Sequence, residues 1–92
     1  DLIASGDTML RAAQAVRRAG ARDVLAFAAH GLFVSPAAEL LADATISRIV
    51  VSDSVPPFRL PADGPVARKL QVVSAAPLFA QAIRDCHESW AN

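Results

Sequence analysis

The chain has 92 residues, of which 53% are hydrophobic and 20% are charged, and its nine basic residues balance nine acidic ones. This composition suits one soluble domain with a single core and argues against a disordered chain. Zero net charge removes any global field that would attract nucleic acid or an anionic membrane, so we expect neither as a partner. The sequence has neither a membrane-length apolar run nor an opening signal-peptide pattern, and its lone cysteine is Cys86. We therefore expect a cytoplasmic protein without disulfides.

Residues 1–8, Asp-Leu-Ile-Ala-Ser-Gly-Asp-Thr, are typical of the end of a buried strand that passes through a tight polar loop into a helix. Such a loop directs backbone N–H groups and the positive end of the helix dipole at an anion, which indicates a phosphate cradle. An ordinary helix cap has the same residue types, and these eight residues taken alone favour the cap.

Two helices and a strand are predicted next. Met9, Ala12, Ala13 and Val16 recur at helical spacing, which predicts an amphipathic helix over residues 8–19. The unbroken apolar run 24–29 predicts a strand covered on both faces. Ser35 and Pro36 then suit the cap and first position of a short helix, residues 36–42, with Leu40 and Leu41 turned inward.

His30 follows the strand over residues 24–29 directly. Ligands of open α/β sheets collect beyond the carboxyl ends of strands, so His30 is a candidate near-site residue. The alternative is a histidine that is hydrogen-bonded to a loop carbonyl and has no catalytic role.

The second half of the chain predicts strands over residues 46–52 and 70–74, with a long loop between them. This loop, residues 55–69, contains four of the six prolines and shows no periodicity. A last helix begins at Pro77, and its apolar stripe predicts five core residues: Phe79, Ala82, Ile83, Cys86 and Trp90.

The order of these elements predicts an α/β fold with a parallel sheet and right-handed crossovers. The opening strand is very short for a parallel sheet. We therefore expect partner elements upstream in a longer polypeptide.

Four stretches in this order resemble one family over nearly the whole chain. DLIASGDT is similar to the ribose-phosphate loop of type I phosphoribosyltransferase-fold proteins. GARDVLAFAAHGLF, IVVSDSVP and VVSAAPLFAQAIR resemble the ribose-phosphate pyrophosphokinase family. By this resemblance, residues 1–92 are the C-terminal segment of an incomplete phosphoribosyltransferase-like domain, with residues 55–69 as a Pro-rich insert.

The resemblance implies an intact enzyme that transfers diphosphate from ATP to ribose 5-phosphate with Mg²⁺, releasing AMP, and that assembles into homo-oligomers. Asp1 would contact the ribose hydroxyls directly or through Mg²⁺. The 5-phosphate would lie against the residues Ala4, Ser5, Gly6, Asp7 and Thr8. The family's catalytic and ATP-binding residues lie mostly upstream, so this segment alone should contain no catalytic residue and be inactive.

Two positions depart from the family pattern, which usually has Asp at position 4 and Gly at position 7. We expect the added Asp7 carboxylate to turn outward and cap the helix, since a phosphate about 4 Å away would repel it by about 1 to 4 kcal/mol. These departures keep two alternatives open: a non-catalytic, synthetase-associated regulatory or assembly protein, and a phosphoribosyltransferase.

Overall fold

The structure is a computed structural model that describes residues 2–91, except for the side chains of Trp90 and Ala91. Its strands are β1 (Leu2–Ile3), β2 (Leu25–Ala28), β3 (His30–Gly31), β4 (Arg48–Ser52) and β5 (Leu70–Val73). Its helices are α1 (Asp7–Arg18), α2 (Ala37–Leu40), α3 (Pro65–Lys69) and α4 (Ala76–Ala91). Strand β1 pairs with β3, β2 with β4 and β4 with β5, and every pairing is parallel. The predicted α/β fold with a parallel sheet is confirmed.

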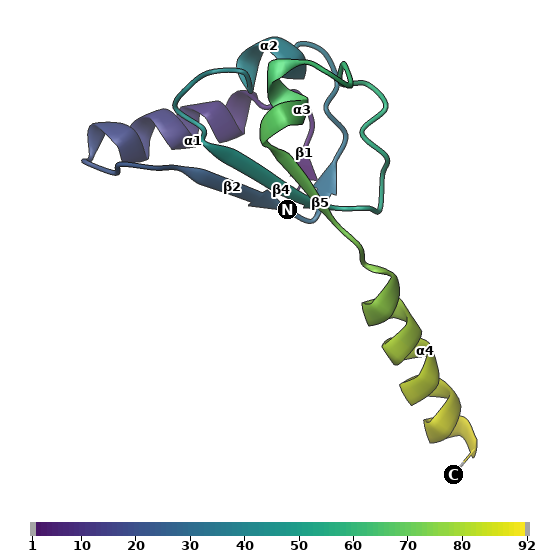
Figure 1. Ribbon diagram of the computed structural model, residues 1–92. Coiled ribbons are helices and arrows are strands. Elements are labelled where there is room, and N and C mark those ends of the chain that lie inside the picture. The colour runs from purple at the N-terminus through teal and green to yellow at the C-terminus, as the bar shows by residue number, and fades with distance from the viewer. Residues whose placement is uncertain (1, 92) are drawn as a thin grey trace.

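Strands β2 and β3 form one extended run that is interrupted at Ala29. The backbone N–H and the hydroxyl of Ser52, at the end of β4, both donate to the Ala29 carbonyl. The two small sheets therefore lie edge to edge, with their carboxyl ends on the same side of the molecule (Figure 1).

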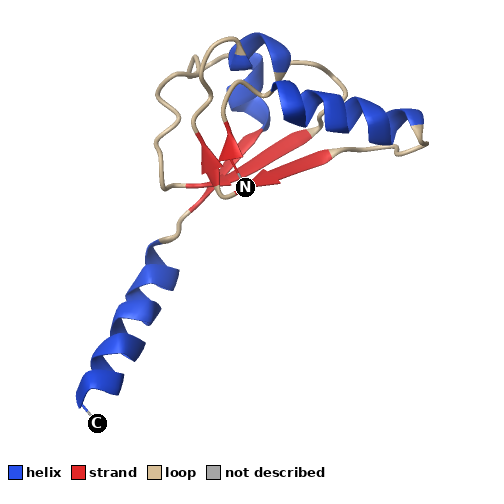
Figure 2. Ribbon diagram, turned by 180° about the vertical axis from the view of Figure 1, so that it is seen from behind, coloured by secondary structure: helices blue, strands red, loops and turns tan. Residues whose placement is uncertain are grey.

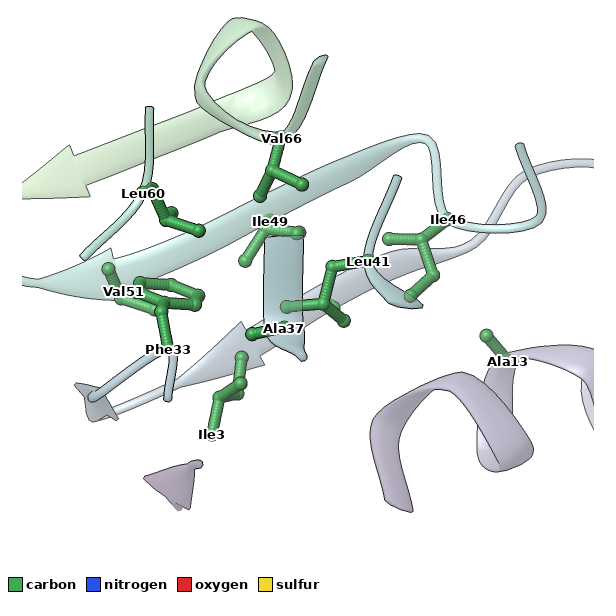
Figure 3. Close-up of a cluster of buried hydrophobic side chains, with 11 residues drawn as sticks. Ile3, Ala13, Phe33, Ala37, Leu41, Ile46, Ile49, Val51, Leu60 and Val66 are labelled. Atoms are coloured by element: carbon green, nitrogen blue, oxygen red, sulfur yellow. The ribbon is translucent and has the colours of Figure 1, made fainter. Parts of the chain in front are cut away.

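The core lies on one face of the sheet, beneath α1, α2 and α3 (Figures 1 and 2). Along β4, Ile49 and Val51 point into it while their neighbours point away, as the period of two in a strand requires. Figure 3 shows how this cluster of buried apolar side chains meets between sheet and helices: Ile3, Ala13, Ala26, Phe33, Ala37, Leu41, Ile46, Ile49, Val51, Leu60 and Val66.

The opposite face of the sheet is open in the described chain. Leu25, Phe27 and Val73 expose 54%, 64% and 48% of their surface there. The prediction that the strand over residues 24–29 is covered on both faces is therefore wrong for this chain. An exposed apolar strand face is nevertheless typical of a surface that packs against another protein segment.

Helix α4 projects away from the body (Figures 1 and 2). Phe79 and Ile83 are 63% and 69% exposed, and Ala82 and Cys86 are exposed as well, so the prediction that they are core residues is wrong for this chain. The predicted core position of Trp90 lies outside the described side chains. Two hydrogen bonds hold the backbone at the start of the helix, from Ala75 N–H to Asp53 Oδ1 and from Ala76 N–H to Ser74 Oγ. In the described part of the chain, no helix combines the length and apolar character needed to cross a membrane.

The predicted loop over residues 55–69 contains a helix. Helix α3 occupies its last five residues, with Pro65 at the start and Gly64 as the N-cap residue, so the loop prediction is wrong there. Proline suits the first turn of a helix because its missing N–H has no partner at that position. Lys69 ends α3 and donates to the carbonyls of Asp43 and Ile46, both at 2.9 Å, and its partial burial lowers its pKa. The Pro-rich insert is thus anchored at its C-terminal end.

Two helix starts differ from the sequence predictions. Helix α2 begins at Ala37 with Pro36 as its N-cap residue, so Ser35 does not cap it. The predicted inward turn is confirmed for Leu41, which is fully buried, whereas Leu40 is only half-buried. Helix α1 begins at Asp7, with Gly6 as the N-cap residue at φ 86°, a left-handed conformation that favours glycine.

We expect Leu41→Ala to lower the free energy of unfolding by about 2 to 5 kcal/mol, because it removes a fully buried side chain from the centre of the core. The matched control is Leu78→Ala on α4, where the leucine is 74% exposed and the change should cost little. Urea unfolding of the 92-residue chain measures the free energy of unfolding of both variants. Equal losses of this free energy would contradict a core that lies on one face of the sheet.

A second stability prediction concerns Gly6, where an added Cβ would lie 2.7 Å from Cγ of the buried Leu41. Gly6→Ala should therefore cost both the left-handed strain of about 1 to 2 kcal/mol and a further packing term. Gly20→Ala is the control, because Gly20 also has a positive φ, 110°, but a Cβ there meets nothing within 4 Å. Thermal unfolding compares the two variants. If Gly6→Ala lowers the melting temperature no more than Gly20→Ala does, the contact with Leu41 does not hold the loop in place.

Candidate functional site

A cavity of about 270 Å³ lies where β1 passes into α1. The cavity is lined by the end of the strand, the connecting loop and the first turn of the helix: Leu2, Ile3, Ala4, Ser5, Gly6, Asp7, Thr8, Met9 and Ala12. The described residues of the predicted cradle, Ala4 to Thr8, therefore lie together around one hollow. None of the described lining residues is a lysine or an arginine.

The start of α1 contributes backbone amide groups to this cavity. The hydrogen bond from Leu10 N–H to the Gly6 carbonyl, at 2.9 Å, is the first one along α1. The N–H groups of Asp7, Thr8 and Met9 precede it and lie in the turn that has no intrahelical acceptors. Together with the positive end of the dipole, they suit an anionic ligand.

Two hydroxyl groups supplement these amides. Ser5 is half-buried in the loop, and Thr8 is exposed on the first turn of α1. No side-chain oxygen caps α1, which leaves the Ser5 and Thr8 hydroxyls free of that role. Each hydroxyl is both a donor and an acceptor, so both groups can donate to a phosphate oxygen.

Asp7 lines the cavity and does not cap the helix. Its carboxylate pairs with the guanidinium of Arg11, one turn further along α1, at 2.9 Å. The prediction of a cap is wrong because Gly6 occupies the N-cap position and Asp7 is the first helical residue. The ion pair partly neutralises the negative charge nearest the cavity, and both of its members are exposed.

Residues 32–34, which follow β3, hold the loop through backbone hydrogen bonds. Leu32 N–H donates to the Ile3 carbonyl at 2.8 Å, and Val34 N–H donates to the Ala4 carbonyl at 2.9 Å. Phe33, between them, has φ 53° and a buried ring. The ring lies so close to Gly31 that a Cβ there would be 2.5 Å from Cε2 of Phe33. Glycine at position 31 therefore allows the phenylalanine to fill the core under the cradle.

His30 follows the interruption after β2 and is the first residue of β3. Its backbone is in register with Leu2, which lines the cavity. Nδ1 of His30 is 2.7 Å from the hydroxyl of Ser54 rather than bonded to a loop carbonyl. Ser54 was missed by the sequence reasoning, although its position just after β4 parallels that of His30 after the preceding strand.

Asp1, the predicted contact to the ribose hydroxyls and to Mg²⁺, lies outside the described residues. Within residues 2–91, no three His, Cys, Asp or Glu side chains gather into a group that could hold a metal ion. The carboxylates of Asp7 and Asp53 are engaged by Arg11 and by the Ala75 N–H. Mg²⁺ is usually bound through one or two carboxylates together with waters and substrate phosphates, so the prediction of Mg²⁺ stays a prediction.

Known proteins similar to this chain share both its sequence and its fold. Ribose-phosphate pyrophosphokinase from Caldanaerobacter subterraneus subsp. tengcongensis is 40% identical over 88 residues, which are 96% of this chain and 27% of the relative. The protein of the same name from Helicobacter hepaticus is 37% identical over 93 residues, covering 100% of this chain and 28% of its own length. The crystal structure of phosphoribosylpyrophosphate synthetase from Mycobacterium smegmatis has a TM-score of 0.78 at 34% identity, over 97% of this chain and 28% of that one.

The chain thus spans little more than a quarter of the length of these relatives. The model of the phosphoribosyl synthetase-associated domain matches residues 1–91, nearly the whole chain. This match agrees with the parallel α/β fold and with the loop that opens α1. The chain belongs to the phosphoribosyl synthetase-associated domain family.

Proposed function

We propose that this chain is the ribose 5-phosphate-binding segment of a ribose-phosphate diphosphokinase, which transfers diphosphate from ATP to ribose 5-phosphate and gives phosphoribosyl pyrophosphate and AMP. The observation that carries the proposal is the cavity at the start of α1, bounded by the loop that resembles the family's ribose-phosphate loop. Relatives that are 40% and 37% identical to this chain over 88 and 93 residues are named ribose-phosphate pyrophosphokinase.

In this proposal the 5-phosphate lies against the first turn of α1. The N–H groups of residues 7–9 and the hydroxyls of Ser5 and Thr8 donate to its oxygens. Diphosphoryl transfer needs positioning and charge stabilisation more than covalent catalysis, so a segment that fixes the sugar phosphate contributes through orientation. The chain holds the acceptor sugar with its C1 hydroxyl directed away from the cradle, toward the second substrate.

The described lining residues supply no basic side chain to the phosphate. Its charge must then be balanced by the helix dipole, by the backbone amides and by groups outside residues 2–91. In the proposal, the remainder of the parent protein supplies the ATP site and the catalytic basic residues. Mg²⁺ would be held there and by Asp1, because within residues 2–91 no three His, Cys, Asp or Glu side chains gather into a metal-binding group.

The open face of the sheet suits packing against that remainder. Leu25, Phe27 and Val73 present an exposed apolar surface on one side of a parallel sheet, which ordinarily has both faces covered. The relatives are more than three times as long as this chain, which spans 27% and 28% of them, so they contain the material for a covering layer. We propose that upstream elements of the same polypeptide occupy this face.

A non-catalytic, synthetase-associated role is the second candidate, and the two unusual loop residues favour it. Ala4 offers no carboxylate to the ligand, and Asp7 adds a negative charge to the rim, although Arg11 pairs with it. In such a protein the weakened cradle would serve assembly or regulation. A phosphoribosyltransferase is less well supported, because the relatives at 35–40% identity carry the pyrophosphokinase name.

The experiment that separates these functions is an AMP-release assay on the full-length protein with ATP, Mg²⁺ and ribose 5-phosphate. The enzyme proposal expects AMP to appear only when both substrates are present. Calorimetric titration with ribose 5-phosphate runs alongside. Binding without AMP release by the folded protein would favour the regulatory role, and the lack of both would overturn the ribose 5-phosphate assignment.

Asp7→Gly tests whether the carboxylate faces away from the ligand. Because the Asp7 carboxylate pairs with the exposed guanidinium of Arg11, the variant should bind ribose 5-phosphate with an affinity within about twofold of the parent protein. Arg11→Ala is the companion variant, since it releases the carboxylate and should weaken binding slightly. Titration calorimetry of the full-length protein measures both. A tenfold or larger gain for Asp7→Gly would show that the carboxylate opposes the phosphate.

A further inference from the structure

A second cavity, of about 500 Å³, lies next to the cradle, and the proposed function does not use it. Val34 lines this cavity, and its N–H donates at 2.9 Å to the carbonyl of Ala4, which lines the cradle. The two cavities have no described lining residue in common. A ligand in the second cavity would therefore occupy a site of its own, and a volume of this size is typical of sites for small organic molecules.

This cavity combines an apolar part with a few polar groups. Its apolar lining residues come from the segment after β3, from α2 and from the Pro-rich insert: Phe33, Val34, Ala38 and Pro61. Its polar lining residues are Ser35, Glu39 and Arg59, one from each of the same three segments. Sites for small molecules are usually built in this way, with apolar walls for contact area and a few polar groups for orientation.

Arg59 is the one basic residue among the described lining residues, and its guanidinium is already held in place. One of its N–H groups donates to the carbonyl of Leu32 at 3.2 Å, and its Cζ lies 4.3 Å from the centroid of the Phe58 ring. Leu32 directly precedes Phe33, so the first contact holds the guanidinium at the edge of the cavity. The next residue of the insert, Leu60, is buried in the same core cluster as Phe33 (Figure 3). A guanidinium has five N–H donors, and the remaining ones suit the two oxygens of a carboxylate.

Arg59 and Glu39 bring opposite charges to the cavity without pairing with each other. Within residues 2–91 the only ion pair is that of Asp7 with Arg11. Two unpaired opposite charges suit a ligand that carries both charges itself, with a carboxylate for Arg59 and an ammonium group for Glu39. A phosphate dianion suits the cavity less well, because the carboxylate of Glu39 repels its second negative charge.

We infer that this cavity binds a small α-amino acid with an apolar side chain. Arg59 binds its carboxylate, Glu39 binds its ammonium group, and the apolar lining residues contact its side chain. The basis is the juxtaposition of a held guanidinium, an unpaired carboxylate and apolar residues around one cavity. The inference goes beyond the proposed function and gives a role to the Pro-rich insert, which supplies Arg59.

The test titrates the full-length protein with L-leucine by calorimetry and compares two probes that each lack one charged group. 4-Methylpentanoate keeps the carboxylate and the side chain but has no amino group, and 3-methylbutylamine keeps the amine and the side chain but has no carboxylate. L-leucine should bind most tightly. Each of the other probes should bind about tenfold more weakly or worse, because each loses the hydrogen bonds to one charged residue.

Variants then assign each charged group to its residue. Arg59→Ala should weaken the binding of L-leucine and 4-methylpentanoate about tenfold and leave that of 3-methylbutylamine unchanged, and Arg59→Lys, which keeps the charge but not the planar fork, should recover part of the loss. Glu39→Gln should weaken L-leucine binding without weakening 4-methylpentanoate binding. Arg68→Ala is the matched control, because it removes the same charge from an exposed arginine of the same insert that does not line the cavity.

Three outcomes would overturn the inference. The first is the lack of L-leucine binding to the folded parent protein, and the second is an equal loss for Arg59→Ala and Arg68→Ala. The third uses inorganic phosphate as a further probe: if Arg59→Ala weakens phosphate binding more than L-leucine binding, the cavity takes a phosphate group and the assignment to an amino acid is wrong. The melting temperature of each variant without any probe shows that the variant is folded, and Arg59→Lys provides the second variant if Arg59→Ala is not.

Discussion

The contact between Gly6 and Leu41 is the constraint on which the site depends. Leu41 is fully buried, and a Cβ at position 6 would lie 2.7 Å from its Cγ, so the loop rests directly on the core. The left-handed conformation of Gly6 turns the chain sharply from β1 into α1 and leaves the first amides of the helix facing the cavity. A loop that rests on a packed core keeps those amides in place without any ligand, which is what preorganised binding requires.

The segment after β3 supplies a second support for the loop, and this support also depends on a glycine. Gly31 allows the ring of Phe33 to pass under the sheet edge, and the amides on either side of Phe33 hold the carbonyls of Ile3 and Ala4. The cradle is thus fixed from the core by Leu41 and from the neighbouring strand by residues 32–34. Both supports are apolar or backbone interactions, so the polar groups of the loop remain available to a ligand.

Much of the fold followed from local patterns. Helical spacing predicted α1, apolar runs predicted β2, β4 and β5, and the polar loop after Ile3 predicted the hollow that the structure contains. The failures concern apolar surfaces that the described chain does not cover. Phe27, Phe79 and Ile83 have the apolar character of core residues, and their spacing does not distinguish a covered face from an exposed one. Helix α3 was missed because prolines mask a helix whose first turn tolerates them.

The sequence predicted where the candidate site lies but not which contacts its side chains make. The sequence located residues 4–8 in the loop before the first helix, while the ion pair of Asp7 with Arg11 and the bond of His30 to Ser54 required coordinates. The central claim is that the cradle holds the phosphate of ribose 5-phosphate, and a crystal structure of the full-length protein with that ligand tests it most directly. The account predicts phosphate oxygens within about 2.7 to 3.2 Å of the backbone nitrogens at the start of α1. A phosphate bound away from residues 5–9 would contradict it.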